Sequence, residues 1–584
     1  MAIDPFTVEV LRSALPAITN EMSHVLNRTS YNMMIYEVGD YCCSVVDTRG
    51  YLVSQNAGGV SHFVADLGVV VQDAMRRIKR FSPGDVIITN HQAVCGQHLN
   101  NIVVYTPFFY KDELIAFTMI RAHWIDVGGY STGFGAGVAA TDPWLEGLQL
   151  NQLKIYDAGV PNQPLLDMIA DNIRLPESSM GDLRSQIAAC QLGVRRLTEL
   201  FDKYGQETVA AAVEQIFQET EARCRLTVEE FEDGEYEYEG AFDDAASPVD
   251  GPIRIAAKVI IRGSDMTIDL SGCSKQRNSA INARTLAAPY SAYKALTRPL
   301  DPVNEGSFRA LKVILPEGSF MMAKFPAPMA EWSVALPTVV DVILGALAPA
   351  HRSRVPAAHK GAMGDNITFF GIAPLTGKRF VVQSIEGGGW GGRPTEDGPS
   401  GAVTVCQGDV RNSPIESLEQ RFPIIVEQRA LRPDSAGAGK HRGGLGLDIR
   451  VRNLVEGRWN LPLTGRYKFP PKGLWGGKSG HSGGRKVQLP NAEWRDVNAS
   501  WYEVPAHSRA LIESAGGGGW GDPLERDPQL VLRDACDGLI SKAAAEKDYG
   551  VIIRATGRSG PEAFVIDEPA TRAARSKRVG ELVG

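Results

Sequence analysis

Two apolar runs separated by three polar residues form the clearest pattern in the first part of the chain. Residues 102–110 and 114–123 are rich in Val, Ile, Phe, Tyr and Thr, and Lys111, Asp112 and Glu113 lie between them. Strand-forming runs joined by a short polar turn are typical of a β-hairpin. We therefore expect these residues to fold back on themselves, which brings the two ends of the stretch together.

The remaining periodicity predicts an α+β chain. Apolar residues recur at helical spacing over the first 20 or so residues and again over 164–225. Strand-like runs fill much of the rest, and the acidic stretch 228–244 alternates Glu with Tyr, as an exposed edge strand does. At 584 residues the chain exceeds a single core. We expect an α/β domain that ends in helices, a β-rich domain with one helix and a glycine-rich β/α region, with bounds of 1–227, 228–350 and 351–584.

Composition excludes several classes of protein. The chain has 61 Lys and Arg against 68 Asp and Glu, and only the short C-terminal "RAARSKR" is strongly basic, so we expect no nucleic-acid partner. No export signal begins the sequence and no apolar run reaches the roughly 18 residues of a membrane helix, so we expect a cytoplasmic protein without membrane contact. Eight cysteines without a CxxC motif favour reduced thiols.

Glycine-rich stretches do not make convincing nucleotide or nucleophile motifs. "GLWGGKSG" resembles a phosphate-binding loop, but Lys472 occupies the position of its first glycine and no helix start follows. "GHSGG" matches GxSxG without the strand and helix that a nucleophile elbow requires. For "EGGGWGG" and "AGGGGWGDP", the freedom of glycine at positive φ accounts for tight turns without a ligand. We expect no nucleotide site in this chain.

The open end of the hairpin carries candidate metal ligands. A turn centred on Asp112 places Asn101 opposite His123 and His98 opposite Asp126. Opposed side chains lie about 5 Å apart at Cβ, so two imidazoles and a carboxylate would share one volume, a ligand set that suits Zn, Mn or Fe. A register slip of one residue would turn them to the other face, and ordinary core or surface histidines are then the alternative.

Two acidic residues that precede an earlier apolar run, which begins at residue 41, add candidates for catalysis. Glu37 and Asp40 lie in "YEVGDYCC", and the same domain supplies His62. Carboxylates near a metal either ligate it or act as a general base. Solvated loop residues are the alternative.

Several stretches, taken in order, carry a resemblance over nearly the whole chain. They include "EVGDYCCSVVDTRGYLVSQ", "PGDVIITN", "GQHLNNIVVYTPFF", "RAHWIDVGG", "DLSGCSKQRNSAIN", "NEGSFRALKVILPEGS", "RNSPIESLE", "GAGKHRGGLG" and the ending "GGGGWGDPLERDPQLVLRDACDG". Together they resemble hydantoinase B, a component of ATP-dependent hydantoinases that is related to the C-terminal half of 5-oxoprolinase and to the α-type subunits of acetone and acetophenone carboxylases. The matches are specific for the family and much less so for a substrate.

The resemblance implies a divalent metal, Zn or else Mn or Fe. The implied ligands are Asp40, His98, His123 and Asp126. Asp40 serves as the fourth ligand or, like Glu37, as a base, and His62 lies beside the ligands. The family usually has Asp where this chain has Asn101, and a neutral amide is a weaker ligand, so we expect Asn101, like His62, beside the ligands and not among them.

The implied function is that of the metal-binding subunit of a two-subunit enzyme. Its partner is a larger, hydantoinase A-like subunit that binds ATP and Mg, and a heterotetramer is expected. The partner would phosphorylate a cyclic amide, such as a lactam, a hydantoin or 5-oxoproline, and this chain would open the ring. The alternatives are a subunit of a ketone carboxylase, which would use bicarbonate, and a non-catalytic scaffold in which Asn101 marks a lost site.

Overall fold

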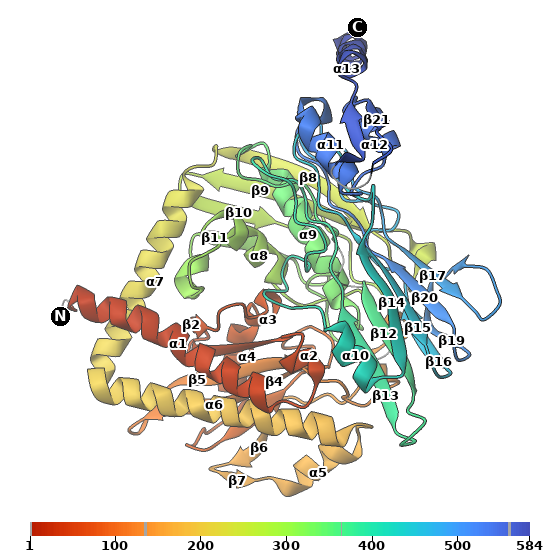
Figure 1. Ribbon diagram of the computed structural model, residues 1–584. Helices are drawn as coiled ribbons and strands as arrows, with labels where there is room; N and C mark the ends of the chain where they lie inside the picture. The colour runs from red at the N-terminus through yellow and green to blue at the C-terminus, as the bar shows by residue number, and fades with distance from the viewer. Residues whose placement is uncertain (1–2, 134–136, 362, 364, 559–561, 584) are drawn as a thin grey trace. The chain divides into compact units, whose positions relative to one another are not determined.

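The computed structural model describes residues 3–133, 137–361, 363, 365–558 and 562–583 (Figure 1). The chain forms two compact units, and each is discontinuous in sequence. The first unit comprises Met1–Glu239, Ile253–Ile343 and Val405–Pro414, and the second comprises Gly240–Pro252, Leu344–Thr404 and Ile415–Gly584. The predicted α+β class is confirmed, with several mostly antiparallel sheets. The division into 1–227, 228–350 and 351–584 stays a prediction.

A seven-stranded antiparallel sheet forms the centre of the first unit. Its strand order is β2-β1-β5-β4-β3-β6-β7. The strands are β1 (Tyr41–Asp47), β2 (Leu52–Gln55), β3 (Val86–Thr89), β4 (Asn101–Tyr110), β5 (Glu113–His123), β6 (Leu153–Asp157) and β7 (Val160–Pro161). The expected hairpin is present as β4 and β5, in the middle of the sheet.

Long helices cover one face of this sheet (Figure 1). Helix α1 (Pro5–Thr29) begins at Asp4, whose side chain accepts a hydrogen bond from the Thr7 amide, and Pro5 takes a first-turn position where no N–H is needed. Its buried residues recur every three or four positions and pack on β1, β4 and β5; they are Val8, Leu11, Leu15, Ile18, Met22 and Leu26.

The helical stretch predicted at 164–225 is confirmed. It consists of α5 (Gln163–Asp171), α6 (Pro176–Tyr204) and α7 (Gln206–Val228). Pro176 is the first residue of α6, where proline fits because that position donates no helical hydrogen bond. The alternating stretch that follows is also as expected, since β8 (Gly234–Phe242) is the last strand of a four-stranded sheet with β9 (Ile253–Arg262), β10 (Asp265–Asp269) and β11 (Leu311–Ile314).

The first unit also contains shorter α-helices and a 3-10 turn that matter for the sites described below. They are α2 (Met33–Tyr36), α3 (Ser61–Val64), α4 (Leu67–Arg77), α8 (Ala287–Leu296) and the 3-10 turn η4 (Glu305–Phe308). Helix α9 (Trp332–Leu347) supplies Trp332 to the same unit.

The second unit contains two larger antiparallel sheets. One has the order β13-β12-β16-β19 and the other β14-β15-β20-β17-β18. Their strands are β12 (Asn366–Ile372), β13 (Arg379–Ile385), β14 (Ile424–Leu431), β15 (Leu447–Asn453), β16 (Gly457–Leu461), β17 (Gly484–Gln488), β18 (Arg495–Asp496), β19 (Ala499–Val504) and β20 (Arg509–Glu513).

Except at Gly521, whose φ is 74°, the glycine-tryptophan stretches of this unit are not the positive-φ turns that we expected. Gly516–Gly519 and the glycines of 387–392 do not adopt positive φ. They lie side by side with 437–446 and 472–480, joined by hydrogen bonds such as Gly517 N–H to Gly444 O and Gly519 N–H to Lys478 O, 2.9 Å each. A Cβ on Gly517 would overlap the carbonyl of Trp390. The missing side chain, and not a special φ, is what these positions require.

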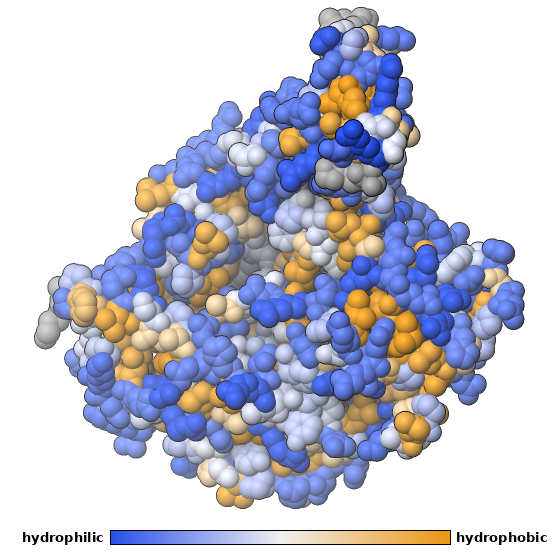
Figure 2. All heavy atoms as spheres, in the orientation of Figure 1, coloured by the Kyte–Doolittle hydropathy of each residue, from blue (hydrophilic) through white to orange (hydrophobic). Residues whose placement is uncertain are grey.

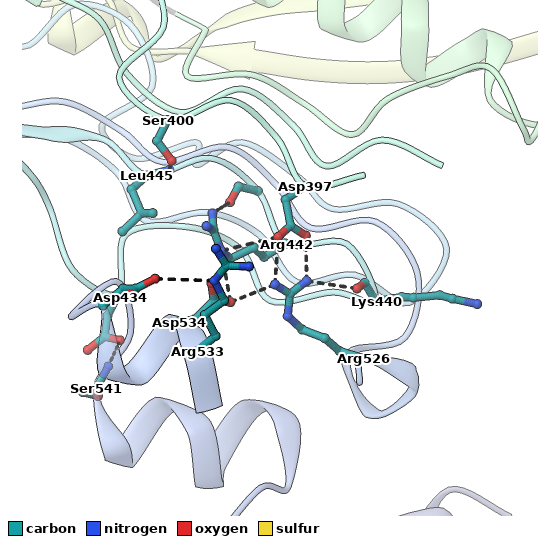
Figure 3. Close-up of polar contacts among 12 residues, drawn as sticks. Asp397, Ser400, Asp434, Lys440, Arg442, Leu445, Arg526, Arg533, Asp534 and Ser541 are labelled. Atoms are coloured by element: carbon teal, nitrogen blue, oxygen red, sulfur yellow. Dashed lines mark hydrogen bonds and ion pairs between the residues drawn. The ribbon is translucent and has the colours of Figure 1, made fainter. Parts of the chain in front are cut away.

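A charged network ties the C-terminal helices to these glycine-rich segments (Figure 3). Arg526, which is 2 % exposed, donates two parallel hydrogen bonds to Asp397, of 2.6 and 2.8 Å, and another of 2.8 Å to Asp534 on α11 (Pro528–Cys536). Arg442 also donates to Asp534, at 3.2 Å. Two buried guanidinium groups are thus matched by two carboxylates, as burial of charge demands.

No helix in the described part of the chain is both long and apolar enough to cross a membrane.

Candidate functional site

The register of the hairpin places two candidate residues side by side. Asn101 pairs with His123, as predicted, and the pairing continues unchanged to Phe108 opposite Ala116. Lys111 takes positive φ, 55°, in the turn, and a bulge follows Phe108. The register expectation is therefore confirmed at the end of the hairpin where it bears on the site.

Strand β1 adds Asp40 on the other side of His123. Tyr41 pairs with Ala122, and the His123 amide donates to the Asp40 carbonyl at 3.2 Å. Residues that are opposite one another on neighbouring strands project to the same face of a sheet. Asp40, His123 and Asn101 therefore form a row across three strands.

Three polar atoms converge at this row. The Asn101 Oδ1 lies 2.9 Å from His98 Nε2 and 3.1 Å from His123 Nδ1, and the two imidazole nitrogens are 3.2 Å apart. His98 and His123 are 6 % and 0 % exposed. The structure thus brings His98, Asn101 and His123 into one compact triangle of nitrogen and oxygen atoms, which we call the imidazole triangle.

Hydrogen bonds fix the orientation of the Asn101 amide. Gln97 Nε2 donates to the His62 carbonyl at 2.9 Å and to Asp66 Oδ2 at 3.0 Å. Because both partners only accept, the Gln97 amide has one orientation, and its Oε1 must face a donor, which is Asn101 Nδ2 at 2.7 Å. The carbonyl oxygen of Asn101 is consequently the atom that faces the imidazoles.

Burial keeps the imidazoles neutral. It lowers the pKa of His98 to about 4 and that of His123 well below its ordinary value. His98 Nδ1 lies 3.3 Å from the Ala330 carbonyl and Nε2 lies 2.9 Å from Asn101 Oδ1, and both of these oxygens only accept. Neutral His98 carries one N–H, so it can donate to only one of them. Neutral imidazole is the protonation state in which histidine binds a metal ion.

Asp40, whose backbone is paired with His123, has a buried carboxyl. It is 7 % exposed, and burial raises its pKa to about 7. Glu37 lies outside the row, half-buried at the end of α2, where its amide donates to the Met33 carbonyl.

Asp126 does not lie opposite His98, as the hairpin pattern predicted. The paired strands end at Asn101 and His123, so the expected pairing of His98 with Asp126 does not form. Asp126 accepts hydrogen bonds from the amides of Gly128, Arg174 and Leu175, at the start of α6. In the described part of the chain, no three His, Cys, Asp or Glu side chains are grouped as a metal site would group them. The triangle has an amide where a carboxylate would complete such a group.

His62 lies next to the triangle, as expected. Its Nδ1 is 2.7 Å from the Cys406 carbonyl, and its ring is 5.0 Å from that of Trp332, which lies 5.9 Å from the His98 ring. His62 and His98 are therefore both in contact with the ring of Trp332.

Arg121 was missed by the sequence reasoning. It is fully buried on β5, two residues before His123 and on the same face, with Nη1 3.6 Å from Asp66 Oδ2 and Nη2 donating to the Cys95 carbonyl at 3.3 Å. Among the described residues its Nε has no hydrogen-bond partner. An arginine inside the apolar run "FTMIRAH" was the available signal, since an arginine is rarely buried without a specific reason.

Comparisons with known proteins assign the family. The family model for hydantoinase B/oxoprolinase matches residues 4–523. A relative from Pseudomonas sp. (strain NS671), named as the candidate B component of a D-/L-hydantoinase, is 34% identical over 577 residues, which cover 94% of this chain and 95% of that protein.

Two solved structures are similar throughout. The ATP-dependent caprolactamase from Pseudomonas jessenii matches with a TM-score of 0.88 and 27% identity, over 99% of this chain and 100% of that one. Nucleotide-free acetone carboxylase matches with a TM-score of 0.88 over 99% of this chain and 83% of that one, but at 18% identity, which shows the fold alone. The chain belongs to the hydantoinase B/oxoprolinase family.

Proposed function

We propose that this chain is the metal-binding subunit of an ATP-dependent enzyme that opens a cyclic amide. The observation that carries this proposal is the imidazole triangle with Asp40 beside it, in a chain whose relatives include a hydantoinase component and a caprolactamase. Lactams, hydantoins and 5-oxoproline are the substrate classes in question.

The donor set fits a divalent cation. His98 Nε2, His123 Nδ1 and Asn101 Oδ1 already converge. Asp40 lies opposite His123 in the backbone register, but its carboxylate is not grouped with the two imidazoles, so as a ligand it would have to turn toward them. Imidazole and oxygen ligands suit Zn, Mn or Fe. A bound cation supplies Lewis acidity, which polarises a carbonyl and favours proton loss from water at neutral pH.

The chain's own residues then orient the reaction. Asp40, with a pKa near 7, accepts a proton from water at neutral pH when it is not itself a ligand, and Glu37 is the reserve candidate for the same role. Asp126 holds the segment after His123 against the start of α6, so in this proposal it positions the second imidazole. Arg121 supplies a buried positive charge on the same face, which favours negative charge that develops nearby.

The proposal assigns ATP to a partner subunit. The stretch 473–480, which resembles a phosphate loop in sequence, packs against 516–519 through glycine backbone, and Lys478 pairs with Asp548 at 2.7 Å. A phosphate loop instead opens a helix whose free amides face the phosphates. Hydrophobic side chains interrupt the polar surface (Figure 2). The proposed partner is a hydantoinase A-like subunit, within a heterotetramer.

Two other functions stay under consideration. The fold shared with acetone carboxylase favours a ketone carboxylase subunit as the second candidate. That enzyme would need bicarbonate and would give a β-keto acid in place of a ring-opened acid. The neutral Asn101 favours the third candidate, a scaffold subunit that holds no metal.

Co-expression with the ATP-binding partner tests the proposal. A panel of lactams, hydantoins, 5-oxoproline and ketones is assayed for ADP release and product mass, with and without bicarbonate. We expect ring-opened acids without bicarbonate, and we expect His123→Ala to abolish turnover while the complex still assembles. Products that require bicarbonate would support the carboxylase, and full activity of the His123→Ala enzyme would exclude this histidine from the site.

A further inference from the structure

A cavity of about 350 Å³ lies within the first unit, away from the imidazole triangle. Its walls come from five segments, namely residues 50–55, 61–72, 286–295, 299–308 and 405–406. Small-molecule sites occupy about 300 to 1,000 Å³, so the cavity has the size for a ligand of few atoms.

The α3–α4 segment separates this cavity from the triangle. The residues that line the cavity recur at helical spacing, and they are Ser61, Val64, Ala65, Gly68, Val69 and Gln72. Asp66 lies on the opposite side, where it contacts Gln97 and Arg121. His62 contacts the carbonyl of Cys406, which also lines the cavity. One helical layer thus has a cavity on one face and the candidate metal centre on the other.

The cavity wall is mostly apolar, and two residues of opposite charge are part of it. Tyr290 stacks on Phe308 with centroids 4.2 Å apart, and aliphatic side chains such as Leu52 and Val303 complete the wall. Glu305 lines the cavity as a half-buried carboxyl that accepts a hydrogen bond from the Leu52 amide. Lys294 also lines it, and its Nζ donates to the carbonyls of Arg298 and Asp301.

We propose that this cavity binds a small zwitterion with an aliphatic spine, of the ω-amino acid class. The ammonium group would bind Glu305, the carboxylate would bind Lys294, and the spine would lie on the apolar wall. Opposite charges separated by an apolar surface match such a ligand better than they match a neutral or singly charged one.

This inference rests on the proposed function and narrows it. Opening a lactam frees an amine and a carboxylate, so its product is an ω-amino acid. Opening a hydantoin gives a ureido acid, which has no ammonium group for Glu305. The cavity is then a product site of lactam-type chemistry, and it touches Cys406, whose carbonyl holds His62 at 2.7 Å.

Calorimetric titration of the purified full chain tests the proposal. The probes are 6-aminohexanoate, 6-ureidohexanoate, hexanoate and hexylamine. We expect 6-aminohexanoate to bind at least tenfold more tightly than each of the others, and Glu305→Gln to remove that advantage. Val69→Trp should abolish binding, because Val69 lines the cavity, whereas Met75→Trp, on the same helix and equally exposed but outside the cavity, should leave it unchanged.

The outcomes separate this proposal from the proposed function. Equal binding of all four probes, or binding that survives Val69→Trp, would overturn the zwitterion site even if the enzyme opens lactams. Loss of binding in His123→Ala would also overturn it, because the probe would then lie at the triangle. Tight, Glu305-dependent binding in both the wild-type and His123→Ala chains would support the cavity, whatever the fate of the metal proposal.

Discussion

Asn101 is the residue on which the chemistry of the proposed centre depends most. Its side-chain oxygen lies 2.9 and 3.1 Å from two imidazole nitrogens, and its amide nitrogen donates to Gln97 at 2.7 Å. A carboxylate here would add a charge toward a cation, yet it would also place an acceptor against the acceptor Oε1 of Gln97. The gain in metal affinity and the loss in the hydrogen-bond network therefore oppose each other.

We predict that Asn101→Asp binds Zn or Mn at least tenfold more tightly but lowers the stability of the metal-free chain by about 1 to 3 kcal/mol, the cost of a buried polar group that loses its partner. Competition with a chromophoric chelator and thermal unfolding without metal measure the two effects. Asn162→Asp, an exposed helix cap, adds the same charge and should change neither. Unchanged metal affinity in Asn101→Asp would exclude residue 101 from the ligands.

At the residue scale, sequence reasoning reached only what a single hairpin determines. The pairing of Asn101 with His123 follows from two runs and one turn. Asp40 joins them through the pairing of β1 with β5, and Asp126 turns to α6; both depend on contacts between distant segments, which alternation of apolar residues does not encode. Arg121 was visible only as a charge out of place in an apolar strand.

At the scale of elements, the sequence shows where glycines are concentrated, but it does not show which structural role they have. Glycine-rich composition suggested turns, because positive φ is the commoner reason for glycine. The structure shows backbone packed against backbone at 387–392 and 516–519, which depends on which segments become neighbours.

Close packing of this kind makes Gly517 intolerant of a side chain. A Cβ there would overlap the Trp390 carbonyl, and backbone atoms on both sides cannot move aside. We predict that Gly517→Ala destabilises the chain by about 3 kcal/mol or more, as overpacking does. Gly484→Ala is the matched control, because its Cβ would meet only the flexible end of Glu513. Equal stability of the two variants by chemical denaturation would show that the segments have room to separate.

Helix α6 contains a carboxyl that should make stability depend on pH. Asp182 is fully buried, its Oδ1 accepts from the amides of Tyr31 and Asn32, and burial raises its pKa to about 7. A group whose pKa is higher in the folded chain stabilises it at low pH, and that contribution is lost as pH rises through about 7.

We therefore predict that the melting temperature of Asp182→Asn, relative to the wild-type chain, rises between pH 5 and pH 8. The amide imitates the protonated acid and does not titrate. Asp167→Asn, at an exposed position on α5, is the control for the removal of one carboxylate. A difference for Asp182→Asn that does not change with pH would mean that Asp182 stays ionised in the folded chain.

At the scale of the whole molecule, the mixed fold and the main helices could be predicted from periodicity, but the two units could not. Each unit is assembled from separate segments, and residues 405–414 return to the first unit, where Cys406 holds His62. Sequence order alone divides a chain only into consecutive parts.

The proposed division between subunits also limits what this chain does alone, because the stretch 473–480 packs against 516–519 and opens no helix. We predict that the purified chain hydrolyses no ATP by itself and does so only with its partner subunit. Phosphate release assays on the single chain measure this. Sustained ATP turnover that follows the chain through successive purification steps would contradict the division of labour between the subunits.

The central claim is that the hairpin brings its polar ends together around a metal ion. The most direct test is elemental mass spectrometry of the wild-type chain and of His98→Ala, both purified without chelators or metal-affinity columns. We predict about one Zn, Mn or Fe per wild-type chain and its loss in the variant, because His98 supplies one of the three converging donors. A metal content that is the same in both chains, or no metal in either, would contradict the account.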